Sequence, residues 1–168
     1  MTNSVYASVV VVACVGAGVV ARAAPGQSAP PSPVNVCSLL TVQEASAALG
    51  ETVKDGKAGD TGGRSVMPNT AVSYCEFASP TSVHRVHINV WRTSTAAQVQ
   101  QMGQMVCGRK TKDGLDGLGD IACWYDTKHE ELQVYKGPFF LSVEMSRRWN
   151  DPTEAIKGVA KAALPRLP

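Results

Sequence analysis

The residue types that could do chemistry are few in this chain. A histidine, His84 or His87, beside Asp120 or Glu144 would be the general base of a small hydrolase. His84 and His87 are three residues apart on a predicted strand, so they point to opposite faces and make a poor metal pair. No serine lies in a Gly-x-Ser-x-Gly elbow, and no carboxylates are paired at helical spacing. The sequence therefore predicts no catalytic residue and no metal ligand, and a hydrolase is the weaker hypothesis.

Two glycine-rich loops could hold an ion. Residues 58–65 resemble a phosphate-binding loop, but Ala58 replaces its first glycine and Arg64 its lysine. Residues 54–70 are therefore predicted to form a flexible surface loop. Residues 113–120 hold three aspartates, yet their spacing does not fit an EF-hand and the acceptor glutamate is missing. Turn formation explains the Asp and Gly residues, so neither loop predicts a cofactor.

Three tryptophans are the candidates for a binding surface. Trp91, Trp124 and Trp149 are large side chains of the kind that dominates interfaces when it lies outside a core. Burial in the core is the alternative for all three, and the sequence leaves that choice open.

Length and charge limit the class of protein. The chain has 168 residues, of which 44% are apolar, so it is long enough for one domain with a substantial core. The 16 basic and 14 acidic side chains nearly cancel, and no run of Lys or Arg exceeds two residues. Nucleic-acid binding therefore has no electrostatic support.

The N-terminus predicts export. Residues 5–21 are mostly apolar, and Ala21-Arg22-Ala23 fits a signal-peptidase pattern, so residues 1–23 are predicted to be a cleaved signal peptide. Lipidation of Cys14 and an uncleaved anchor are the alternatives. Residues 24–34 form a proline-rich linker, and residues 35–168 a single disulfide-bonded domain. All three alternatives predict a secreted, periplasmic or cell-envelope protein.

Hydrophobic periodicity predicts an α+β domain. A capping box at Thr41 and Glu44 begins the first helix, and Gly50 ends it. A second helix begins at Ser94 or Thr95, and a third is capped by Asp151. Strands are expected at residues 71–78, 83–91, 121–126, 131–136 and 139–146. The order α-β-β-α-β-β-β-α predicts a mainly antiparallel sheet of about five strands covered by helices.

Three short motifs resemble a known group of proteins. The first is Cys37-Ser38-Leu39-Leu40-Thr41-x-x-Glu44-Ala45-x-x-Ala48-Leu49-Gly50, the second Cys75-Glu76-Phe77, and the third Gly117-Leu118-Gly119-Asp120. They are similar to motifs of small secreted bacterial envelope proteins and lipoproteins, including actinobacterial lipoprotein domains of unassigned function. The resemblance implies an envelope protein and carries over no catalytic residue.

The cysteines predict two structural disulfides. Without Cys14 an even number remains, and none of the four forms a Cys-x-x-Cys pair. Of the three pairings, we expect Cys107 with Cys123, because Cys107 ends a helix and a turn returns the chain to the strand that holds Cys123. We expect Cys37 with Cys75, because Cys37 can reach that strand from the start of the first helix; the resemblance suggests the same pair.

These observations favour a non-enzymatic binding module that needs no cofactor. Its expected partner is an unknown protein or a small apolar ligand of the cell envelope, with membrane attachment only through a lipid or an N-terminal anchor. The alternative is an inhibitor or immunity protein that acts on a secreted enzyme.

Overall fold

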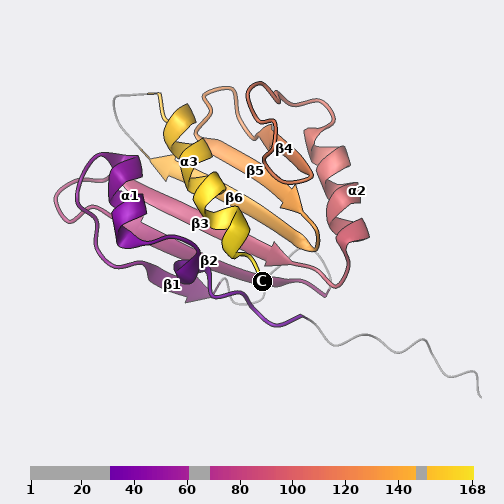
Figure 1. Cartoon of the computed structure of the whole chain (residues 1–168), viewed down its shortest axis with the longest axis horizontal. Coiled ribbons are helices and arrows are strands. Elements are labelled where there is room, and N and C mark those ends of the chain that lie inside the picture. The colour runs from indigo at the N-terminus through magenta and orange to yellow at the C-terminus, as the bar shows by residue number, and fades with distance from the viewer. Residues whose placement is uncertain (1–30, 61–68, 147–150) are drawn as a thin grey trace, which may run out of the picture.

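The computed structural model describes residues 31–60, 69–146 and 151–168, and it shows an α+β fold. One antiparallel sheet of six strands has the order β1-β2-β3-β6-β5-β4 (Figure 1). The strands are β1 (Lys57–Asp60), β2 (Ala71–Ala78), β3 (Arg85–Arg92), β4 (Ile121–Trp124), β5 (Glu131–Lys136) and β6 (Phe139–Ser146). The helices are α1 (Val42–Leu49), α2 (Ala96–Cys107) and α3 (Thr153–Ala163), with short 3-10 helices η1 (Val36–Leu39) and η2 (Leu164–Arg166).

The first face of the sheet is the face covered by α1 and α3, which lie beside each other across it (Figure 1). Alternate residues of the strands point to this face, as the period of two requires. Val86, Ile88 and Val90 of β3 are at most 1% exposed there, so this strand directs three apolar side chains into the core. Ile156 of α3 is fully buried against the same core. The main hydrophobic core therefore lies between this face and the two helices.

The second face is the opposite side of the sheet, and α2 packs on it over β4 and β5. A smaller core forms there around Val99 and Cys107 of α2 and the rings of Tyr135 and Phe140. The rings of Tyr135 and Phe140 are stacked, with their centroids 4.7 Å apart. The Phe140 ring also stacks on Trp91, with a centroid distance of 4.5 Å. Since the main contacts of α2 are with β4, β5 and β6, this helix covers mostly the β4–β6 half of the second face.

The first helix begins and ends as predicted. Thr41 and Glu44 form the complete capping box, and Gly50 adopts the left-handed conformation at φ 72°. Thr95 caps α2, which ends at Cys107. The start of α3 differs slightly, because Thr153 is its first residue. Asp151 lies just before the N-cap residue Pro152, and its carboxylate accepts a hydrogen bond from the backbone N–H of Thr153 at 2.9 Å. It therefore still satisfies one of the free N–H groups at the start of the helix.

The prediction of five strands is wrong by one. β1 lies within the segment that was expected to be a flexible loop, and it pairs with β2. Its sequence, Lys-Ala-Gly-Asp, has low strand propensity, so pairing with β2 rather than local preference makes it a strand. Gly59 is required there, because a Cβ atom would lie 1.9 Å from Cζ of Tyr74. The remaining element order agrees with the prediction.

Two disulfides join the elements. Cys37 in η1 bonds to Cys75 in β2, and Cys107 at the end of α2 bonds to Cys123 in β4. These are the two pairs that the sequence predicts, and they fit an oxidising extracytoplasmic compartment. Within the described residues, no helix is long and apolar enough to cross a bilayer. The predicted signal peptide, Cys14 and most of the linker lie outside the described residues.

Candidate functional site

The three tryptophans do not share one surface. Trp91 is partly exposed on the second face, where its ring stacks on Phe140. Trp124 is 1% exposed and belongs to the core of the first face, so for this residue the structure shows the core alternative that the sequence left open. The alternation of β4 turns this ring inward, where it stacks on His129 at 4.6 Å. Trp149 lies outside the described residues.

His84 belongs to a polar cluster at the β2–β3 turn. Its Nδ1 lies 2.5 Å from Oε1 of Glu51, and the hydroxyls of Ser79 and Ser82 also donate to that carboxylate. The bond from Ser79 and then the bond from His84 lower the pKa of Glu51. In a nucleophilic relay the histidine contacts the hydroxyl, whereas here the carboxylate stands between them. The cluster therefore anchors the turn to the segment after α1.

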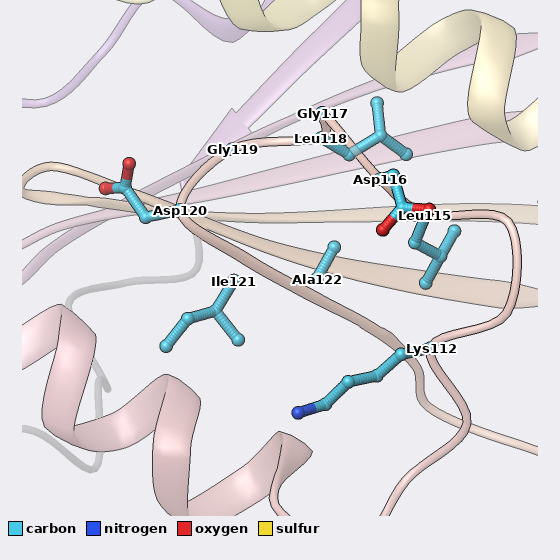
Figure 2. Close-up of a pocket in the computed structure, with 9 residues that line it drawn as sticks. All are labelled: Lys112, Leu115, Asp116, Gly117, Leu118, Gly119, Asp120, Ile121 and Ala122. Carbon is cyan, nitrogen blue, oxygen red and sulfur yellow. The ribbon is translucent and has the colours of Figure 1, made fainter.

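Asp120 is far from both predicted histidine partners along the sheet, at the start of β4. Its Oδ2 accepts the N–H of Gly137 at 2.8 Å, and its own N–H donates to the Tyr135 carbonyl at 2.8 Å. Figure 2 shows its carboxylate directed away from the neighbouring hollow. These bonds hold the start of β4 on β5, which is a structural role.

The glycine-rich turn before β4 borders a hollow of about 230 Å³ (Figure 2). Leu115 and Leu118 are buried and anchor the turn, while Gly117 and Gly119 have φ values of +78° and +65°. A Cβ atom at Gly119 would lie 2.6 Å from Cγ1 of Val134. Both this close contact and the positive φ therefore favour glycine at this position. Packing and backbone geometry therefore explain the Gly-Leu-Gly-Asp motif without a ligand.

The second face pairs two glutamates in register. Glu131 of β5 and Glu144 of β6 are direct cross-strand partners. His87 of β3 is the partner of Glu144 on its other side, with Nδ1 4.0 Å from Oε2. Nε2 of His87 is buried and has no hydrogen-bond partner among the described residues. Of the predicted pairs, the structure thus brings His87 and Glu144 together, although the sequence did not single out Glu131.

Glu131 is held by neutral donors from its own face. Ser142 Oγ donates to Oε1 at 2.9 Å and Gln133 Nε2 donates to the same oxygen at 3.1 Å. Tyr135 in turn donates its hydroxyl to Gln133 at 3.2 Å. Burial, and to a smaller extent the charge of Glu131, raise the pKa of Tyr135 to about 12. The phenol therefore remains a donor over the physiological pH range, and the network fixes the Glu131 carboxylate in place.

The same two glutamates line an open hollow of about 360 Å³ between the β4–β5 turn and β6. The other acidic residues around it are Asp126 and Glu130, and Lys128 is its one basic residue. Tyr125 also lines the hollow and is 53% exposed, which is unusual for a ring of this size. Lys110 Nζ lies 4.1 Å from the centre of this ring. The Tyr125 ring thus already contacts a cation at the edge of an acidic hollow.

On this face the hydroxyl of Ser142 lies beside the Glu131 carboxylate. Ser142 is 3% exposed and donates to Glu131, so it has neither the accessibility nor the histidine contact of an activated nucleophile. A carboxylate that neutral donors fix at the rim of a hollow, as they fix Glu131, can accept hydrogen bonds from a positively charged group. No protein-family model and no curated protein matches this chain.

Proposed function

We propose that this protein is an exported, non-enzymatic binding module of the bacterial cell envelope. The two disulfides support an oxidising compartment, and the sequence of residues 1–23 supports a cleaved signal peptide. Intact-mass measurement of the exported protein tests this part. A mature chain that begins at Ala24 is expected, and a diacylglyceryl group on Cys14 would establish a lipoprotein instead.

We further propose that the binding site is the part of the second face around Glu131, Glu144 and His87. The ligand that fits it is a protein segment with a basic side chain, Lys or Arg. One observation carries this proposal: Glu131 and Glu144 are direct cross-strand partners, and both line the 360 Å³ hollow. Like charges in this cross-strand position destabilise a sheet. A cationic group between them would remove the repulsion and gain two charge-assisted hydrogen bonds.

The surroundings support the same ligand. Glu144 is 49% exposed in its side chain, so an incoming group reaches it without unfolding any element. Tyr125, which is 53% exposed, adds an accessible aromatic side chain to the hollow, and Lys110 Nζ lies against its ring at 4.1 Å from the ring centre. Asp126 and Glu130 extend the negative potential around the hollow, which attracts a basic partner from solution.

The test uses tetralysine as the probe and the exported protein labelled with ¹⁵N. Addition of tetralysine is expected to shift the amide signals of Glu131, Glu144 and His87, and the effect should weaken as salt is added. Glu144→Gln should weaken binding about fivefold, which corresponds to one surface ion pair of about 1 kcal/mol. Glu154→Gln is the matched control, because Glu154 lies on α3 and is 83% exposed.

Tetraglutamate should leave the spectrum unchanged. Shifts spread evenly over all acidic residues, or an equal effect of the Glu144 and Glu154 substitutions, would contradict a specific site on the second face.

A further inference from the structure

The edge strand β1 leaves one side of its backbone without a strand partner among the described residues. It stands at the end of the strand order and pairs only with β2 (Figure 1). Lys57 and Ala58 of this strand are exposed to solvent. Unpaired N–H and C=O groups in strand geometry are a template for another extended chain.

A mainly apolar hollow of about 330 Å³ lies beside this edge. Residues 33–36, which lead into η1, form one wall, and Ala58, Gly59, Val72 and Tyr74 line the other. Its volume is that of a small-ligand site, and large enough for one aromatic or branched side chain. The Tyr74 ring lies directly over Gly59, so the missing side chain at Gly59 determines the shape of this wall.

The edge and the hollow are independent features that meet at Ala58 and Gly59. We infer that together they form a docking site for an extended peptide segment of a partner protein, which adds a strand to β1 and places one apolar side chain in the hollow. Main-chain hydrogen bonds supply affinity in this mode of recognition, and a side-chain pocket supplies specificity. A small apolar molecule would fill the hollow but leave the backbone groups of β1 unpaired, so a peptide satisfies both features.

The short length of β1 limits the contribution of its backbone. Four residues offer few outward hydrogen bonds, and each contributes only about 0.5–1.5 kcal/mol. The apolar side chain in the hollow must therefore provide a large share of the affinity. This site differs from the acidic face of β5 and β6, and either one can be correct without the other.

The experiment selects binders from a library of random heptapeptides displayed on phage, with the full exported protein as the target. Enriched heptapeptides are expected to carry one conserved apolar residue and to shift the amide signals of residues 57–60. Methylation of the backbone nitrogens of such a peptide should weaken its binding at least about tenfold, because it removes the strand hydrogen bonds. Ala58→Trp, which fills the hollow from an exposed position, should have a similar effect.

Val83→Trp is the matched control, since Val83 is 68% exposed at the β2–β3 turn, and it should bind normally. Urea unfolding of each variant shows whether the fold is intact. Val72→Thr provides a second test of the hollow, because it keeps the side-chain shape but adds a hydroxyl to the wall. The inference is wrong if no heptapeptide is enriched. It is also wrong if the selected peptides shift signals around Glu131 and Glu144 instead, or if N-methylated peptides bind equally well.

Discussion

The ion pair between Arg166 and Glu44 should contribute measurably to stability, and its contribution should depend on pH. Arg166 in η2 donates from Nη1 and Nη2 to the two carboxylate oxygens of Glu44, each at 2.7 Å. Nη1 also donates to the Leu39 carbonyl at 2.9 Å. The C-terminal end is thereby fixed to η1 and α1, and Arg166→Gln removes that connection.

The magnitude follows from the pKa of Glu44. The hydrogen bonds from Arg166, followed by the Thr41 backbone N–H, lower this pKa from 4.5 to about 2. At about 1.4 kcal/mol per pKa unit the whole shift would be worth roughly 3 kcal/mol. The side chains of Arg166 and Glu44 are 38% and 33% exposed, and Thr41 supplies part of the shift. After discounting for solvent screening, we expect Arg166→Gln to lower the free energy of unfolding by about 1–2 kcal/mol at pH 7.

Urea unfolding between pH 7 and pH 2.5 is the assay. Because the pKa of Glu44 is lowered in the folded state, its stabilisation is fully present above pH 4.5 and is lost as the pH falls toward 2. The difference between the wild type and Arg166→Gln should therefore shrink over that range toward the contribution of the Leu39 bond, and most of the decrease should occur between pH 4.5 and pH 2.5. Arg109→Gln, at an exposed position after α2, is the control. A difference below about 0.3 kcal/mol at pH 7, or one that does not change with pH, would refute the reasoning.

Three further predictions concern the core, the turn before β4 and the second disulfide, and urea unfolding measures each. Ile156→Ala should lower the free energy of unfolding by about 2–5 kcal/mol because Ile156 is fully buried, and a loss below about 0.5 kcal/mol would mean that α3 packs differently. Gly119→Ala should cost at least about 2 kcal/mol, and more than Gly117→Ala, because the two have similar positive φ but only Gly119 has atoms within 4 Å of the added Cβ; equal losses would contradict the steric argument. Replacing Cys107 and Cys123, 16 residues apart, by alanine should cost about 3 kcal/mol, and an unchanged midpoint would show that this bridge does not stabilise the fold.

Local signals account for the parts of the fold that the sequence predicts well. The capping box of Thr41 and Glu44 depends on residues three apart, so its spacing alone identifies the helix start. The pairing of Cys107 with Cys123 also follows from a short connection between neighbouring elements. β1 has no such signal, because its strand conformation depends on hydrogen bonds to β2 across a loop.

Only part of the candidate site could be predicted from the sequence. Gly137 and Pro138 form a two-residue connection between β5 and β6, and such a connection fixes the register that places Glu131 opposite Glu144. Counting back from that turn would have identified the pair. The contact between His87 and Glu144 could not be found in this way, because β3 and β6 are neighbours only after α2, β4 and β5 have intervened. The inward orientation of Trp124 likewise depends on which face of the sheet α3 covers.

We propose that Glu131 and Glu144 are kept opposite each other in register for a cationic ligand, and that this pairing destabilises the unbound protein. One comparison tests it directly: the free energy of unfolding and the tetralysine affinity of Glu144→Gln, measured side by side with the wild type in low salt. Glutamine keeps the shape of the side chain and an oxygen toward His87, but it removes the repulsion. We predict that Glu144→Gln raises the free energy of unfolding by about 0.2–1 kcal/mol and lowers the affinity for tetralysine about fivefold. A variant that is less stable than the wild type, or that binds tetralysine equally well, would contradict it.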